Sequence, residues 1–349
     1  MSDTQFGEYA RDESRFIGEC TGVVLANREE DIAAAIEAGE PFTVQGARTG
    51  ITGACVPSSC KALCLAGFSG ICGLREEDGG FSVAVRPGTL LLDLRNALGK
   101  KAFATEGWPE SSLKALERFQ NSGEMMFAPD PTEDTAAVGG MFATNAGGPA
   151  SLLYGRTGDN TAGLDVRLAN GELWHIERGA FTFDETGCPL PNGKRLCLSL
   201  PGGAPLLKPL QPRPGADLID LFAGSEGMLG VVERLWLKLI PKPAIRWNVV
   251  FFPETVECAA GFMDALLAAR EGWDCALSAL EYLDGRSLSL FSSLREKQTR
   301  LASIPEFPAG AACAVIAELC AESAEDAEAA LGELLELFLE AGGDEDATW

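Results

Sequence analysis

Three glycine-bearing segments, far apart in the chain, constrain this sequence more than any other feature. They are residues 45–53 (QGARTGITG), residues 129–148 (PDPTEDTAAVGGMFATNAGG) and residues 224–231 (GSEGMLGV). Because glycine lets the backbone approach a ligand closely and adopt positive φ, consecutive N–H groups can point at one anion. Three such segments favour a fold that gathers them around one extended, flat, anionic cofactor, a description that FAD fits.

Each segment taken alone has an ordinary structural interpretation as well. Gly46, Gly50 and Gly53 do not have the spacing of a dinucleotide-binding fingerprint, and no Gly-Lys-Ser/Thr follows them as in a phosphate-binding P-loop. The first segment alone fits a plain glycine-rich turn equally well. Tight turns also explain the second segment, and a strand entry with a satisfied Glu226 explains the third. Their combination is what carries the cofactor hypothesis.

The net charge of the chain argues against two classes of partner. The chain has 349 residues with 28 Lys plus Arg and 51 Asp plus Glu, a net charge of −23. Nucleic acids and anionic membrane surfaces attract basic faces, so neither is expected as a partner. No apolar run reaches the ~18 residues of a transmembrane helix, and residues 1–15 lack the pattern of a secretory signal. We therefore expect a cytoplasmic protein, peripheral to a membrane complex at most.

Eleven cysteines are many for such a chain, and Cys55, Cys60, Cys64 and Cys72 lie close together in sequence. An iron–sulfur cluster usually shows tighter C-x-x-C spacing with a fixed fourth ligand. Free, mostly buried thiols are the favoured interpretation, and no metal site is predicted.

Periodicity predicts two parts. The first part has helices at residues 28–39 and 89–98, strands at 42–44, 81–85 and 232–240, and strands 164–168 and 173–176 joined by a type I′ turn at Asn170-Gly171. Residues 185–215, rich in Gly and Pro, are predicted to form a long surface loop. From residue 244, strands at 247–252, 277–282 and 312–319 alternate with helices, which indicates a second α/β layer. The predicted domains are residues 1–243 and 244–349.

The motifs resemble the vanillyl-alcohol-oxidase-type (PCMH-type) FAD domain, within it the FAD-linked 2-hydroxyacid dehydrogenases that include glycolate oxidase FAD subunits and D-lactate dehydrogenases. The resemblance covers residues 16–340 and is carried by the three segments together with Tyr154-Gly155 and Asp217-Leu218. It implies an α+β fold: a PCMH-type FAD-binding domain of two α/β subdomains with the cofactor between them, followed by a partial ferredoxin-like cap.

The resemblance also implies which residues bind FAD. The first loop would contact the pyrophosphate, the second segment the pyrophosphate and isoalloxazine, and the third the ribityl or adenosine end. The implied residues are Gly46, Arg48, Thr49, Gly50, Ile51, Thr52, Pro129, Asp130, Thr135, Gly139, Gly140, Thr144, Asn145, Gly147, Gly148, Glu226, Gly230 and Val231.

Two departures from the family pattern concern the cofactor. Arg48 stands where the family usually has glycine, so it either pairs with the pyrophosphate or points to solvent. No His lies near these loops, and no Cys stands at the usual place for attaching flavin in the second segment. Non-covalent FAD is therefore implied.

A third departure concerns catalysis. The family's C-terminal His-rich motif, which supplies a metal site and the base for hydride transfer from substrate C2 to flavin N5, is absent. The single histidine, His175, is expected to be a plain strand residue, so no catalytic residue is assigned.

Three interpretations of function remain open. The first is an incomplete or split oxidoreductase for a small 2-hydroxy acid such as glycolate or D-lactate, with the rest of the cap on a second subunit. The second is an accessory FAD-binding subunit. The third is an electron-transfer scaffold that does not oxidise substrate itself, in a complex with an iron–sulfur electron acceptor.

Overall fold

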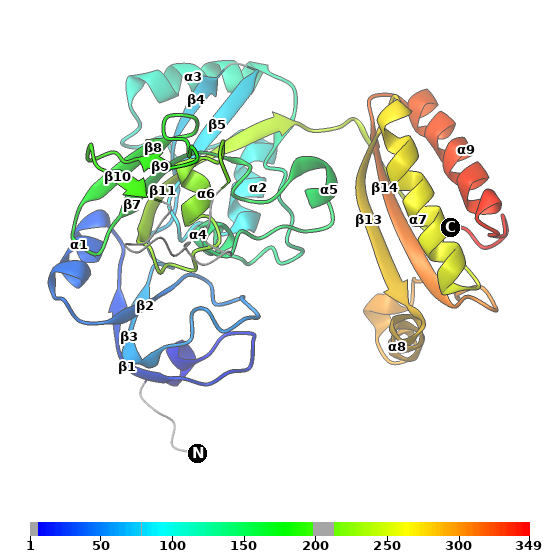
Figure 1. Ribbon diagram of the computed structural model, residues 1–349, viewed down its shortest axis with the longest axis horizontal. Coiled ribbons are helices and arrows are strands. Elements are labelled where there is room, and N and C mark those ends of the chain that lie inside the picture. The colour runs from blue at the N-terminus through cyan, green and yellow to red at the C-terminus, as the bar shows by residue number, and fades with distance from the viewer. Residues whose placement is uncertain (1–5, 78, 198–212) are drawn as a thin grey trace. The chain divides into compact units, whose positions relative to one another are not determined.

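A computed structural model describes residues 6–77, 79–197 and 213–349 of the chain (Figure 1). Its contacts divide the chain into two compact units. The first comprises Met1–Gly148 and Arg156–Lys242, and the second comprises Pro149–Gly155 and Pro243–Trp349. The division lies beside the boundary predicted at residues 243 and 244. The placement of the short segment Pro149–Gly155 with the second unit had no signal in the sequence.

The first unit begins with a small parallel sheet of strand order β1-β3-β2. Its elements are η1 (Gly7–Ala10), β1 (Glu19–Leu25), α1 (Glu29–Glu37), β2 (Phe42–Gln45) and β3 (Ser58–Cys64). Ile32 from α1 packs with Leu63 and Phe68 in a small core. The loop between β2 and β3 contains the first glycine segment, so that segment follows the edge strand β2 of this sheet.

A larger antiparallel sheet, of order β4-β5-β11-β7-β8 with β6 paired to β11, also belongs to the first unit. Its elements are β4 (Ile71–Glu77), β5 (Gly80–Val85), α2 (Leu91–Lys100), α3 (Glu110–Asn121), β6 (Met125–Met126), α4 (Val138–Ala143), β7 (Thr161–Arg167), β8 (Leu173–Glu177), α6 (Leu218–Phe222) and β11 (Val231–Pro241). Leu235, Leu237 and Leu239 alternate along β11 and face the core that these helices cover. The period-2 pattern predicted for residues 232–240 is confirmed.

The hairpin between β7 and β8 is confirmed, but its predicted turn type is wrong. A type I′ turn needs positive φ at both central residues, whereas Gly171 has φ +85° and Asn170 is not among the residues with positive φ. The Gly171 N–H donates to Leu168 O at 2.9 Å, and the Leu168 N–H donates to Glu172 O at 2.9 Å. Ala169 and Asn170 are thus the centre of the turn, and glycine takes the left-handed position after it.

The stretch predicted as a long loop contains a short antiparallel hairpin instead. Its strands are β9 (Gly187–Pro189) and β10 (Arg195–Cys197). Arg195 pairs with Asp184, which helps to fix the hairpin. Residues 198–212 of the predicted loop lie outside the described residues.

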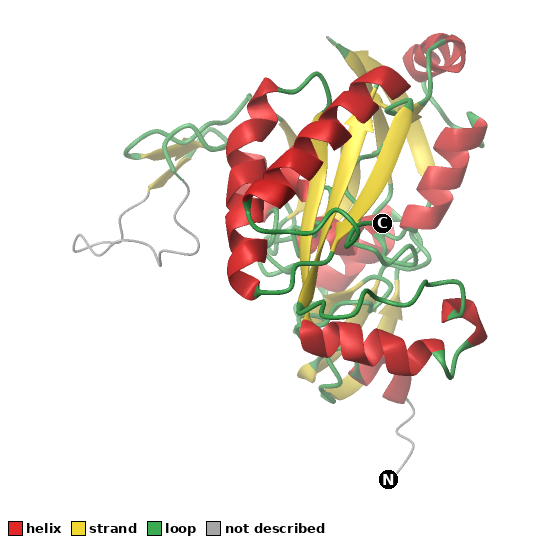
Figure 2. Ribbon diagram, turned by 90° about the vertical axis from the view of Figure 1, so that its right-hand side faces the viewer, coloured by secondary structure: helices red, strands yellow, loops and turns green. Residues whose placement is uncertain are grey.

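The second unit is an antiparallel three-stranded sheet of order β12-β14-β13. Its elements are α5 (Ser151–Tyr154), β12 (Ile245–Phe251), α7 (Val256–Ala269), η3 (Arg270–Gly272), β13 (Ala276–Asp284), α8 (Gly285–Arg295), η4 (Thr299–Leu301), β14 (Cys313–Ala321) and α9 (Ala324–Glu340). Helices α7 and α9 lie together across the strands (Figure 2). Phe251, Phe262 and Phe338 meet in its core with centroid separations of 4.7–5.1 Å.

All eleven cysteines are free thiols. Across residues 6–77, 79–197 and 213–349, no cluster of three or more His, Cys, Asp or Glu side chains is placed to hold a metal ion. Within the same ranges, no helix combines the length and the apolar character needed to cross a membrane.

Candidate functional site

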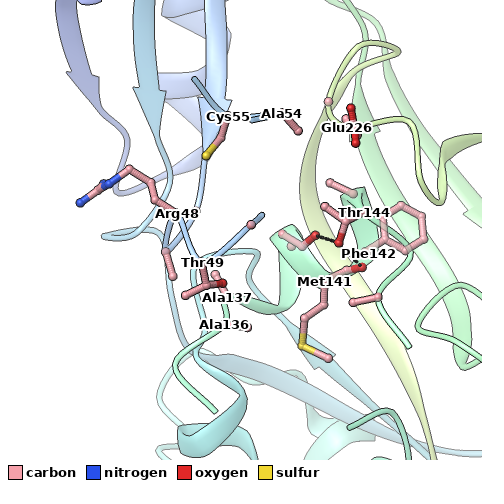
Figure 3. A pocket seen from close by; sticks show the side chains of 18 of the residues that line it. Arg48, Thr49, Ala54, Cys55, Ala136, Ala137, Met141, Phe142, Thr144 and Glu226 are labelled. Carbon is pink, nitrogen blue, oxygen red and sulfur yellow. Dashed lines mark hydrogen bonds between the residues drawn. The ribbon is translucent and has the colours of Figure 1, made fainter. Parts of the chain in front are cut away.

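A cavity of about 610 Å³ lies within the first unit, where parts of all three glycine segments meet (Figure 3). This volume is within the range of about 300–1,000 Å³ typical of small-molecule and cofactor sites. The loop after β2 forms one side, and helix α4 with the residues before β11 forms another. The cavity is lined by eleven of the predicted residues: Gly46, Arg48, Thr49, Gly50, Ile51, Thr52, Gly139, Gly140, Thr144, Glu226 and Gly230.

The first loop presents a run of backbone donors. In the part of the chain that the structure describes, the N–H groups of residues 46–52 have no protein acceptor. Arg48 has φ +61°, the left-handed conformation that turns successive N–H groups toward a common point. Such a loop has the donor set for a phosphate or pyrophosphate group, which is the chemistry expected of it.

Helix α4 brings the second segment to the cavity. The Val138 N–H donates to Thr89 O at 2.8 Å and the Gly139 N–H to Pro87 O at 2.8 Å, whereas the Gly140 N–H has no acceptor within the described chain. A Cβ atom built on Gly140 would meet nothing within 4 Å, so this glycine leaves open space beside its free N–H. The backbone there can approach a flat ligand closely.

The third segment is tied to the end of α4 by its backbone. The Gly224 N–H donates to Phe142 O at 3.0 Å, and the Glu226 N–H donates to Ala143 O at 2.8 Å. Glu226 and Gly227 have φ of +54° and +78°. This double attachment explains why segments about eighty residues apart in sequence line the same cavity.

Seven predicted residues do not line this cavity: Pro129, Asp130, Thr135, Asn145, Gly147, Gly148 and Val231. Several of them hold the surrounding backbone instead. Asp130 pairs with Arg95 at 3.1 Å, and Asn145 Oδ1 accepts a hydrogen bond from the Gly158 N–H at 2.9 Å. Val231 is buried in the small core of the parallel sheet. Any contact of these seven with a cofactor remains a prediction.

The guanidinium of Arg48 points away from Met141 and Phe142 (Figure 3). Its Cζ atom lies 4.9 Å from the centre of the Tyr9 ring, in a cation–π contact. Arg48 is the one basic side chain among the described cavity residues, which also include Asp12, Glu13, Glu133 and Glu226. Backbone N–H groups are therefore the main source of positive potential facing the cavity.

Cys55 also lines the cavity, and its Sγ lies 3.5 Å from Asp12 Oδ2. Burial and the neighbouring Asp12 carboxylate raise the pKa of the Cys55 thiol to about 12. Cys55 is thus a neutral thiol at physiological pH, and a neutral thiol is a weak nucleophile.

His175 lies on β8 outside the cavity lining. Its Nδ1 is 2.8 Å from Asp165 Oδ1, on the neighbouring strand β7, and its side chain is 69% exposed. A cross-strand contact of this kind is that of an ordinary strand residue, and no catalytic role is assigned to it.

Sequence reasoning missed part of the cavity. The N-terminal residues Asp12 and Glu13, together with Ala136, Ala137, Met141, Phe142, Phe222 and Ser225, line it as well. Helix α4 was missed because two consecutive glycines read as a turn. The signal that remained was the apolar spacing of Val138, Met141 and Phe142, at i, i+3 and i+4.

The comparisons with known proteins agree with this picture. The FAD binding domain family matches residues 109–177. Over 257 residues the chain is 29% identical to a D-lactate dehydrogenase of Anaerostipes hadrus, an alignment that covers 72% of this chain and 43% of that protein. The glycolate oxidase subunit GlcD of Bacillus subtilis is 26% identical over 250 residues, covering 71% of this chain and 41% of the subunit. The chain thus spans less than half the length of these curated relatives.

A solved structure shows the fold. The chain aligns with an alkyldihydroxyacetonephosphate synthase at a TM-score of 0.60 and 15% identity, over 94% of this chain and 51% of that one. The α+β fold expected from the motifs is therefore confirmed. The FAD binding domain match supports the expectation of FAD as cofactor. The chain is thus similar to D-lactate dehydrogenases and to glycolate oxidase GlcD subunits, and its residues 109–177 match the FAD binding domain family.

Proposed function

We propose that this chain binds FAD in the first unit and serves in the oxidation of a small 2-hydroxy acid. One observation carries the proposal: the first loop and Gly140, whose N–H groups have no acceptor in the described chain, line one cavity in a chain whose relatives include D-lactate dehydrogenases. When bound, FAD supplies an acceptor for two electrons from the α-carbon of the hydroxy acid.

The residues of the chain would hold the cofactor and exclude water. The loop N–H groups would bind the pyrophosphate, and Gly140 would let a flat ring lie against α4. Phe142 and Met141 would supply apolar contact beside it. Because the Cys55 thiol is neutral and no His lines the cavity in the described chain, we propose that FAD is bound non-covalently.

A second candidate function is an accessory FAD-binding subunit or an electron-transfer scaffold. It is supported by the lack of a histidine base: the only histidine, His175, is an exposed strand residue paired with Asp165. Three of the relatives are named as subunits of glycolate oxidase. By analogy with these subunits, we propose that this chain has a partner subunit. We also propose that it acts in the cytoplasm.

Reconstitution tests both candidates. Purified chain is mixed with FAD, unbound flavin is removed, and the flavin absorbance per chain is measured; one FAD per chain is expected. Glycolate or D-lactate is then added without oxygen. Bleaching of the flavin would support oxidation by this chain alone, and retained colour would support the accessory function. Failure to retain FAD would overturn both.

A further inference from the structure

We propose that the N-terminal segment, residues 7–18, forms one wall of the FAD cavity. We further propose that Gln45 is the positioning residue that fastens this segment to the first glycine loop. Gln45 ends β2 and is fully buried. Its Nε2 donates to Tyr9 O at 2.8 Å and to Cys55 O at 2.7 Å. One amide therefore joins the two ends of the loop, residues 45 and 55, to the N-terminal segment.

Further contacts link the same two segments. The Arg48 guanidinium stacks on the Tyr9 ring, and Cys55 Sγ lies 3.5 Å from Asp12 Oδ2. Asp12 is held in turn by the Ser14 N–H, which donates to its Oδ1 at 2.9 Å. The segment's own ends are also paired, because the Gly18 N–H donates to Ala10 O at 2.8 Å.

The N-terminal segment contributes residues to the cavity lining. Asp12 and Glu13 line the cavity from the N-terminal segment, together with residues that α4 supplies. A Cβ atom built on Gly50 would lie 4.0 Å from Asp12 Oδ2, so the segment sits against the loop that presents the free N–H groups. If the segment moved away, the loop would lose the support that fixes the direction of those donors. This step rests on the proposed FAD site.

Glutamine is suited to this place for a chemical reason. Both carbonyls need a donor, and a primary amide supplies two N–H bonds from one nitrogen. The remaining atom, Gln45 Oε1, is buried and has no hydrogen-bond partner in the described chain. An unpaired buried acceptor lowers the stability of the folded protein, so the Oε1 atom gives no reason for a glutamine at this position. The two donated bonds are what the position requires.

Limited trypsin digestion of the protein without FAD tests the fastening without reference to activity. Arg11, Arg15 and Arg48 lie in the two linked segments and are tryptic sites. In Gln45→Leu, loss of two buried hydrogen bonds should raise the cleavage rate at these sites about tenfold, while other sites keep their rates. Gln120→Leu is the matched control, because Gln120 Nε2 also donates to a backbone carbonyl, that of Lys101, but far from the loop in sequence and on the surface. Unchanged cleavage at all three arginines in Gln45→Leu would overturn the proposal.

FAD titration supplies the second readout. Gln45→Leu should raise the FAD dissociation constant about tenfold or more, because two hydrogen bonds are lost. Gln45→Glu should bind FAD weakly at about pH 8 and recover in part toward about pH 6, since a protonated carboxyl donates one hydrogen bond in place of the amide's two and burial raises its pKa. Other ionisable or charged groups lie near residue 45, namely Tyr9, Asp12, Arg48 and Cys55. The wild type has the same groups, so its FAD dissociation constant at both pH values is the reference. A merely structural role would give no such recovery.

The outcomes separate the two proposals. If the wild type binds no FAD, the proposed function fails, and the digestion result still decides whether Gln45 fastens the segment. If the wild type binds FAD and the Gln45 variants bind it equally well, the positioning role fails alone. Should the Gln45 variants not fold, Asp12→Ala breaks the contact with Cys55 and should raise cleavage at Arg48; unchanged cleavage there would overturn the proposal.

Discussion

Gly148 lies directly against the backbone of Asp130: a Cβ atom built on it would come within 1.5 Å of the Asp130 carbonyl oxygen. Gly148 also has φ +151°, a conformation open essentially only to glycine. Both residues belong to motifs that suggested direct cofactor contact. In the structure neither lines the cavity, and their closeness instead fixes the course of the backbone on either side of α4.

Gly148→Ala should therefore destabilise the protein without FAD by about 3 kcal/mol, from the clash and the strained φ together. Urea unfolding followed by circular dichroism measures this. Gly99→Ala is the control, since Gly99 lies in α2 and an added Cβ would meet nothing within 4 Å; it should stabilise by about 0.5–1 kcal/mol. An unfolding midpoint for Gly148→Ala equal to that of the wild type would contradict the packing argument.

Gly140→Ala should separate stability from cofactor binding. Gly140 is helical and an added Cβ meets no protein atom within 4 Å, so the variant without FAD should gain about 0.5–1 kcal/mol. The same methyl group would stand in the cavity beside the free N–H and should weaken FAD binding about tenfold, or ~1.4 kcal/mol. Thermal unfolding and fluorescence titration with FAD give the two numbers. Gly99→Ala should show the first effect and not the second; unaltered FAD affinity in Gly140→Ala would count against the proposed site.

Arg48→Ala tests which of two roles this residue has. Pairing with the pyrophosphate predicts a loss of FAD affinity of more than about 1 kcal/mol, the scale of a hydrogen bond to a charged group. The contact with Tyr9 instead predicts a smaller loss, and this is the outcome we expect. Isothermal titration with FAD decides between them, with Arg48→Lys as the companion that keeps the charge. A loss well above tenfold in Arg48→Ala, restored in Arg48→Lys, would assign Arg48 to the pyrophosphate.

The raised pKa of Cys55 predicts slow alkylation. With a pKa of about 12, only a minute fraction of this thiol is ionised at about pH 8, and the thiolate is the reactive form. Iodoacetamide should therefore modify the exposed Cys197 first and Cys55 late. Because the Asp12 carboxylate contributes to the shift, Asp12→Asn should lower the pKa and speed labelling of Cys55. Peptide mass spectrometry follows both sites, and early labelling of Cys55 in the wild type would refute the assignment.

Local pattern predicted the regular elements of the structure well where a clear period was present. The alternation before Pro241 gave β11, and the apolar spacing that ends at Phe338 gave α9. Helix α4 was not predicted, because the consecutive glycines Gly139 and Gly140 are typical of a turn. Gly139 is required there because a Cβ would lie 2.4 Å from Pro87 Cβ, a contact between residues fifty-two positions apart.

The sequence by itself determined the class of cofactor, because only glycine-bearing loops can turn runs of N–H groups toward an anion, and such loops are visible as strings of residues. Only the tertiary structure decided which of those residues surround the cavity and which support it. Gly46 and Gly148 look alike in sequence, yet the first lines the cavity and the second packs against Asp130. The role of the N-terminal segment was equally hidden, because the amide of Gln45 reaches it across thirty-six positions, and contacts at that range leave no local pattern.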